Sequence, residues 1–173
     1  FHVETSEDSA NRLKRAITKA ASKDVLNLLE TCFRSEDANI EMNILAYLRK
    51  LFAGLDPNYG RNPSSLEMIP LITIARSVRR EMDNMYGMVR FNKAPDGMYI
   101  AEIEPKYDIL EMIVGHFRCR FPNGTWAIID VKRGFGVYYE NYRTHFVTVP
   151  DPSYISAHAP PDEFTRMWKS YNR

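Results

Sequence analysis

The hydrophobic positions of this chain change their spacing near the middle of the sequence. Up to about residue 86 they recur every three to four residues, which is typical of helices with one buried face. Ser6 and Ser22 each stand where a helix N-cap is expected, and Ser35 is expected to begin a third helix that ends at Gly54. The pattern therefore predicts a helical part over residues 6–86.

A longer fourth helix is expected after residues 56–65, a loop rich in Pro, Gly, Asn and Ser. Pro70 is tolerated only in the first turn of a helix, so the helix should begin near it and continue to Tyr86. The predicted buried face consists of Leu71, Ile74, Ala75, Val78 and Met82.

Strand patterns replace the helical spacing over residues 87–149. Strands are expected at 88–91, 98–103, 125–132 and 135–139. Asp108 is expected to cap a helix between the second and third strands, and Asp96-Gly97 and Pro122-Asn123-Gly124 are expected to be turns. The resulting order is β-β-α-β-β.

The ends of the chain carry weaker patterns. Residues 1–5 are compatible with a short strand, and residues 150–173 read as a proline-rich connector followed by an amphipathic helix docked on the body. We therefore predict an α+β protein with one domain over residues 1–173. Its helical N-terminal half would pack on a small, mostly antiparallel sheet of about four strands.

Composition restricts the possible partners. The 173 residues include 23 basic and 22 acidic side chains, so no global field favours nucleic acid or an anionic membrane, and such binding requires a local patch. Cys32 and Cys119 lie far apart and form neither a metal-binding spacing nor a disulfide framework. No apolar run reaches the length of a membrane span and no leader opens the chain, so we expect a cytoplasmic protein without a membrane partner.

Arginines on the fourth helix form the most basic patch of the sequence. Arg76 and Arg80 are one turn apart and point away from the apolar face. A solvated helix face, with Glu81 and Asp83 as local partners, is the simpler interpretation. The functional interpretation is contact with nucleic-acid phosphates. The candidate phosphate-binding set is Arg76, Arg79, Arg80, Arg90 and Arg133. Four tyrosines could stack bases beside them, or could simply be half-buried strand residues: Tyr86, Tyr99, Tyr138 and Tyr139.

Acidic residues at the strand ends are the candidates for chemistry. Glu102 and Glu104 leave the same face of one extended segment, and Asp130 lies at the end of a later strand. If the two strands are neighbours, the three carboxylates would lie together and could perform acid/base catalysis or bind a divalent cation. Cross-strand ion pairs are the simpler alternative. The candidate catalytic set is Glu104, Asp130 and His116, although His116 is more simply a structural histidine near a helix end. No recognised metal or cofactor motif is present, so we expect neither group.

Residues spread over most of the chain resemble a bacterial family described as DNA metabolism proteins, the domain of unknown function 4130. The resemblance rests on Ile40-Glu41, Tyr47-Leu48-Arg49, Ala75, Val78, Arg80-Glu81, Gly87, Arg90-Phe91, Ala101, Glu104-Pro105, His116-Phe117, Arg120, Trp126, Asp130, Arg133, Tyr139 and Trp168. It implies a companion radical-SAM protein and a role in DNA modification or repair; some relatives carry a uracil-DNA-glycosylase-like domain. Asp83 and Tyr107 stand where histidines are frequent in the family, so a histidine-dependent chemistry does not carry over.

Three functions follow as hypotheses. The first is a DNA-associated accessory protein that works with the radical-SAM partner and binds phosphates through its arginines. The second is an enzyme that acts on a nucleotide or nucleic acid through the carboxylates and His116. The third is an interaction scaffold that docks the companion protein without contacting nucleic acid. Whether the protein is an enzyme is left open by the sequence.

Overall fold

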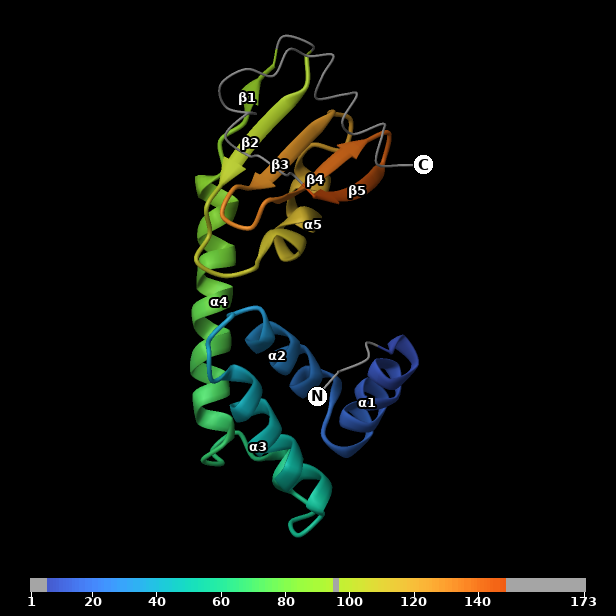
Figure 1. Cartoon of the computed structure of the whole chain (residues 1–173), viewed down its shortest axis with the longest axis vertical. Coiled ribbons are helices and arrows are strands. Elements are labelled where there is room, and N and C mark those ends of the chain that lie inside the picture. The colour runs from blue at the N-terminus through green and yellow to red at the C-terminus, as the bar shows by residue number, and fades with distance from the viewer. Residues whose placement is uncertain (1–5, 95–96, 149–173) are drawn as a thin grey trace. The chain divides into compact units, whose positions relative to one another are not determined.

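A computed structural model describes residues 6–94 and 97–148 of the chain (Figure 1). Within these ranges it has five α-helices, one short 3₁₀ helix and five strands, with the helices dominating the first half and the sheet in the second. This is the α+β class that the sequence predicts. The chain divides into two compact units, Phe1–Arg80 and Glu81–Arg173, and the division falls inside helix α4 (Met68–Met88).

The first two helices begin at the predicted serines. α1 (Glu7–Ala20) follows Ser6, whose hydroxyl accepts the Ser9 N–H at 3.3 Å, and α2 (Lys23–Phe33) follows Ser22, whose hydroxyl accepts the Val25 N–H at 3.2 Å. Each bond satisfies one of the N–H groups that a helix start leaves without an intrahelical partner. Both predictions are confirmed.

The third helix starts later than predicted. α3 (Ile40–Ala53) is preceded by Asn39, and the prediction that Ser35 begins it is wrong. The Ser35 hydroxyl instead accepts the Asp37 N–H, and the Asp37 carboxylate accepts the Asn39 N–H at 2.9 Å. These local side-chain bonds hold the backbone in turns and compete with helix formation. The predicted end is confirmed, because Gly54 adopts a left-handed φ of 65°.

The N-terminal unit has a core built from all four of its helices. α4 begins before Pro70, which lies in its first turn as expected. The 56–65 loop contains a 3₁₀ turn (Tyr59–Arg61), in which Gly60 lies so close to the end of α1 that a Cβ atom would sit 2.8 Å from the Ala20 carbonyl oxygen. The buried core residues are Ile17, Leu29, Cys32, Ile40, Tyr47, Leu51, Met68, Leu71 and Ala75.

The C-terminal unit contains one mixed sheet whose strand order follows the chain, β1-β2-β3-β4-β5 (Figure 1). Its strands are β1 (Asn92–Lys93), β2 (Tyr99–Ile103), β3 (Trp126–Asp130), β4 (Phe135–Glu140) and β5 (Arg143–Thr148). β2 and β3 are parallel and are connected through α5 (Leu110–Arg120), whereas the other three pairings are antiparallel. The mostly antiparallel sheet and its crossing helix are confirmed.

Two element boundaries before β3 differ from the prediction. A strand at 88–91 is wrong, because the Val89 N–H still donates to the Met85 carbonyl oxygen at 3.1 Å and α4 extends to Met88. The first strand is instead the short β1. Asp108 does not occupy the capping position, since Ile109 directly precedes α5.

Strand β5 is absent from the predicted pattern. It follows β4 through a two-residue turn in which Asn141 and Tyr142 have φ values of 49° and 64°. Such a turn requires the left-handed conformation at both positions, which Asn adopts readily and Tyr rarely. The sequence is therefore typical of a hairpin turn at Asn141 but not at Tyr142, where glycine is usual.

Helix α5 covers one face of the sheet. The Phe117 ring of α5 meets the Trp126 ring of β3 edge to face at 6.4 Å, and Trp126 stacks on Tyr139 of β4 at 4.9 Å. Alternation along the strands places Ala127 and Ile129 on the opposite face, in a second buried cluster with Met98.

Several predictions lie outside the described residues, namely the strand at 1–5, part of the Asp96-Gly97 turn, and the connector and helix over 150–173. Within the described residues, Cys32 and Cys119 are both free thiols. No described helix combines the length and the apolar character that a membrane crossing requires.

Candidate functional site

The arginine row on α4 is defined by Arg76, Arg79 and Arg80, which all lie in the N-terminal unit. All three are exposed, while Ala75 and Val78 beside them are buried. Among the described residues, no hydrogen bond or ion pair engages these guanidinium groups. Side chains at i, i+3 and i+4 share one side of a helix, so the row presents three positive charges to solvent together.

Arg90, another member of the candidate phosphate-binding set, folds back on the chain. Its Nη1 donates to the Gly87 carbonyl oxygen and, at 3.2 Å, to the Val89 carbonyl oxygen. These carbonyls lie at the end of α4, where backbone acceptors have no intrahelical donor. Arg90 therefore caps the C-terminus of this helix.

Arg133 forms a buried ion pair with Asp130 in the C-terminal unit. Its Nη1 donates to Asp130 Oδ2 at 2.8 Å, and the two side chains are 10% and 0% exposed. The second carboxylate oxygen of Asp130 accepts the Arg133 backbone N–H at 3.1 Å. The pair closes the turn between β3 and β4. Removing one partner of such a buried pair is costly, because the other charge is then left buried without a counterion.

The same guanidinium also holds the loop between β2 and α5. Arg133 donates to the carbonyl oxygens of Pro105 at 3.2 Å and Lys106 at 3.0 Å. From α4, the two Glu81 carboxylate oxygens accept the N–H groups of Lys106 at 2.7 Å and Tyr107 at 2.8 Å. We call Glu81, Asp130, Arg133 and the 105–107 backbone the polar clasp. It joins α4, the β2–α5 loop and the β3–β4 turn within the C-terminal unit.

The candidate catalytic residues do not form one carboxylate cluster. In the parallel pairing of β2 and β3, Asp130 lies beside Ile103, so Asp130 and Ile103 leave one face of the sheet while Glu102 leaves the other. Glu104 is exposed just beyond β2, and Asp130 is buried in the polar clasp. Across residues 6–94 and 97–148, no group of three or more His, Cys, Asp and Glu side chains is arranged to hold a metal ion.

His116 packs as an aromatic ring. It stacks on Tyr86 with 4.1 Å between ring centres and an interplanar angle of 16°, and it meets Phe117 edge to face at 5.1 Å. Burial in this contact, with the nearby Asp83 charge as a smaller cause, raises the pKa of the Tyr86 hydroxyl above its ordinary value. The stack connects the last turns of α4 to α5, which is a structural use of the imidazole.

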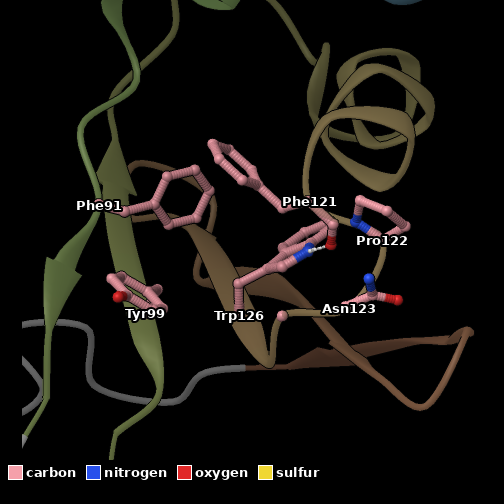
Figure 2. A pocket seen from close by; sticks show the side chains of 7 residues that line it. Phe91, Tyr99, Phe121, Pro122, Asn123 and Trp126 are labelled. Atoms are coloured by element: carbon pink, nitrogen blue, oxygen red, sulfur yellow. Dashed lines mark hydrogen bonds between the residues drawn. The ribbon is translucent and has the colours of Figure 1, made fainter.

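An aromatic pocket lies in the C-terminal unit, where strands β2 and β3 begin (Figure 2). It has a volume of about 450 Å³ and is lined by Phe91, Tyr99, Phe121, Pro122, Asn123, Gly124 and Trp126. Phe91 and Tyr99 approach from the side of β2, Pro122 and Asn123 belong to the turn after α5, and Trp126 lies between them (Figure 2). Tyr99 and Phe121 are 43% and 40% exposed, whereas Trp126 is 1% exposed.

The turn that forms one wall of the aromatic pocket is held by three side chains. Trp126 Nε1 donates to the Phe121 carbonyl oxygen at 3.3 Å, as the dashed line in Figure 2 shows, and the Tyr139 hydroxyl donates to the Pro122 carbonyl oxygen at 3.0 Å. The Tyr142 hydroxyl donates to Asn123 Oδ1 at 2.7 Å. The wall is therefore preformed, as is usual for small-molecule sites.

Only one residue of this pocket is predicted from the sequence as a candidate contact residue. Tyr99 is named above as a residue that would stack bases, and of the four tyrosines in that set it is the exposed one. Phe91, Phe121 and Trp126 come from three separate segments, and no spacing rule predicts that they meet. The density of aromatic residues from Phe117 to Trp126 is the signal that was available.

Comparison with known proteins identifies one family. The model of a domain of unknown function, DUF4130, matches residues 38–173. This range includes the arginine row, the polar clasp and the aromatic pocket. No curated protein and no solved structure matches the chain.

Proposed function

The chain belongs to the DUF4130 family, and we propose that it is a nucleic-acid-binding accessory protein, with DNA as the ligand and a radical-SAM protein as its catalytic partner. The main observation in support of DNA binding is the arginine row. Three exposed guanidinium groups without acidic partners among the described residues stand on one side of a helix. Guanidinium groups match phosphate geometry and bind it through paired N–H donors.

Two further arginines are not assigned to phosphate. Arg90 is engaged with carbonyls at the end of α4, and Arg133 is engaged in the polar clasp. The proposed contact set is therefore Arg76, Arg79 and Arg80. Because the formal net charge is only +1, this local set has to supply most of the attraction to DNA.

The accessory role is supported by what two of the three candidate catalytic residues do. Asp130 is committed to the buried pair with Arg133, and His116 is committed to an aromatic stack. Acid/base catalysis needs a group within reach of the substrate, and Asp130 has no exposed surface. The companion is suggested by the family resemblance, and we assign the reaction chemistry to that protein.

A salt titration of DNA binding tests the proposal. Fluorescence anisotropy with a labelled duplex would give the dissociation constant at several salt concentrations. We expect R76A/R80A to weaken binding and to make the slope of log K against log salt shallower by about 2, since each phosphate contact contributes about 0.9. The matched control R15A/R49A removes two other exposed arginines of the same unit and should leave the slope unchanged.

Two results would overturn the proposal. One is a wild-type protein that binds no duplex at low salt. The other is equal loss of binding in R76A/R80A and in R15A/R49A, which would mean that only net charge matters. Association with the radical-SAM companion is tested separately by co-purification in the presence of nuclease, where loss of the complex would show that DNA alone links the two proteins.

A further inference from the structure

The aromatic pocket is not explained by phosphate binding through the arginine row. Its lining is almost entirely apolar, yet two of its rings, Tyr99 and Phe121, are substantially exposed to solvent. Exposed aromatic rings around a preformed pocket carry a cost in water that ligand binding relieves. The pocket is therefore a candidate ligand site of its own.

The volume and shape of the pocket restrict the ligand. About 450 Å³ lies within the usual range for small-molecule sites and is enough for one planar ring system with its sugar. Its aromatic lining is Phe91, Tyr99, Phe121 and Trp126, and the exposed rings of Tyr99 and Phe121 can offer flat π-faces to a ligand. Such surfaces bind a planar heterocycle by stacking, and the binding tolerates different bases because every base has a π-face.

A positive charge beside one wall of the pocket favours an anionic ligand. The Arg120 guanidinium lies over the Phe121 ring, 5.7 Å from its centre, and Arg120 is exposed at the end of α5. Stacking of a guanidinium on an aromatic ring orients the cation beside the pocket. It can there meet the phosphate that accompanies a base lying on the neighbouring aromatic faces.

Asn123 adds a hydrogen-bonding group to the apolar lining. Its Oδ1 accepts from the Tyr142 hydroxyl, so its orientation is fixed and its amide nitrogen is left to donate. A pocket with aromatic walls and a few oriented polar groups is the usual form of a site for a planar ligand. An apolar side chain of a partner protein would use the rings but neither Arg120 nor Asn123.

We propose that the aromatic pocket binds one unpaired nucleobase of a single-stranded nucleic acid, with Arg120 holding its phosphate. This inference rests on the proposed nucleic-acid binding and adds a preference for unpaired strands over duplex. A base inside a duplex is already stacked on both sides and cannot enter a pocket unless it leaves the helix. The arginine row then provides attraction that is independent of strand pairing, and the pocket provides the discrimination.

Quenching of Trp126 fluorescence reports directly on the pocket. The chain has two tryptophans, and W168F leaves Trp126 as the reporter. In this background the full chain would be titrated with thymidine 5′-monophosphate and with a single-stranded thymidine oligomer, and anisotropy would compare that oligomer with a duplex. We expect saturable quenching by both ligands and tighter binding of the single strand.

Three variants define the binding contacts. F121L keeps an apolar side chain but removes the ring, and we expect it to lower affinity for the single strand about tenfold, within the range for loss of one stacking ring. Y99L should act in the same direction and replaces F121L if that variant does not fold. R120A should weaken mononucleotide binding, whereas R118A, two residues away and thus on a different side of α5, should not.

The outcomes separate this inference from the proposed function. Quenching by the mononucleotide without any salt-dependent binding of polymers would retain a nucleotide site in the pocket but overturn both the DNA-binding proposal and the single-strand assignment. Polymer binding that F121L and Y99L leave unchanged would overturn the pocket and retain the proposed function. Absence of mononucleotide quenching, or equal affinity for single strand and duplex, would also overturn the nucleobase assignment.

Discussion

Asp130 Oδ2 accepts a hydrogen bond from Arg133 Nη1 at 2.8 Å, and the carboxylate that does so has no exposed surface. The sequence predicts different roles for these two residues, catalysis for Asp130 and phosphate binding for Arg133. Their pairing indicates that part of the family resemblance reflects a requirement of the fold. Glu81, Pro105, Asp130 and Arg133 all contribute to the polar clasp, although they come from three separate segments of the sequence.

Breaking this ion pair should destabilise the C-terminal unit. In D130N the Arg133 charge stays buried without its counterion, and we expect a loss of about 3–5 kcal/mol in the free energy of unfolding. Urea titration followed by Trp126 fluorescence in the W168F background measures it. The control E140Q removes an exposed carboxylate of β4 and should change the free energy of unfolding by less than about 0.5 kcal/mol. A D130N effect no larger than that of E140Q would contradict the expected cost of leaving the Arg133 charge without its counterion.

Glu81 should also matter for stability. E81A removes the acceptor of two backbone N–H groups, and we expect a cost of about 1.5–3 kcal/mol because both bonds go to a charged group. Hydrogen exchange of the Lys106 and Tyr107 amides is the sharper measurement, since protection should fall there first. D83A, an exposed acidic residue of the same helix, is the matched control. Unchanged exchange at both amides would contradict the clasp.

A pH dependence is expected in the N-terminal unit. Hydrogen bonds from Lys50 and then from Tyr59 hold the pKa of the Glu67 carboxyl below its ordinary value. A carboxyl with a lowered folded pKa stabilises the fold above its ordinary pKa, and this contribution is lost as pH falls through the folded value. The melting temperature should therefore decrease on acidification, and E67Q should decrease less steeply. Parallel curves for the two proteins would show that this carboxyl does not contribute.

The two cysteines should differ in reactivity. The Cys32 thiol is buried and donates to the Leu71 carbonyl oxygen at 3.0 Å, and burial raises its pKa to about 11. Cys119 is exposed on α5. Because the thiolate is the nucleophile, iodoacetamide at pH 8 should modify Cys119 in the native protein, and Cys32 only after denaturation. Mass spectrometry would locate the modified cysteine. As a control, C119S should remain unmodified in its native state. Rapid modification of Cys32 in the native protein would contradict its burial.

Local signals in the sequence predict much of this fold. The starts of α1 and α2 depend on a serine and the next three residues, and the end of α3 depends on Gly54. The β4–β5 turn is equally local, but its second residue is Tyr142 where glycine is usual. Prediction fails at this turn because the chain uses an uncommon residue in a common conformation.

The candidate sites were less predictable because they depend on long-range contacts. Glu81 reaches Lys106 across 25 residues, and no pattern within either segment indicates that bond. The register of β2 against β3 decides that Glu102 and Asp130 face opposite sides, and spacing along one strand cannot supply it. By contrast, the exposure of Arg76, Arg79 and Arg80 follows from helical periodicity alone, which is why that prediction needed no tertiary information.

The agreement between strand order and chain order has a consequence for biosynthesis. As the chain leaves the ribosome, each new strand can pair with the strand made just before it, so no strand has to wait for a distant partner or insert between two others. The exception in pairing geometry is β2 with β3, which cannot join until α5 has been made and has folded back. We therefore expect the formation of α5 to determine when β3 joins the β1–β2 hairpin, with β4 and β5 pairing next to β3 as successive hairpins.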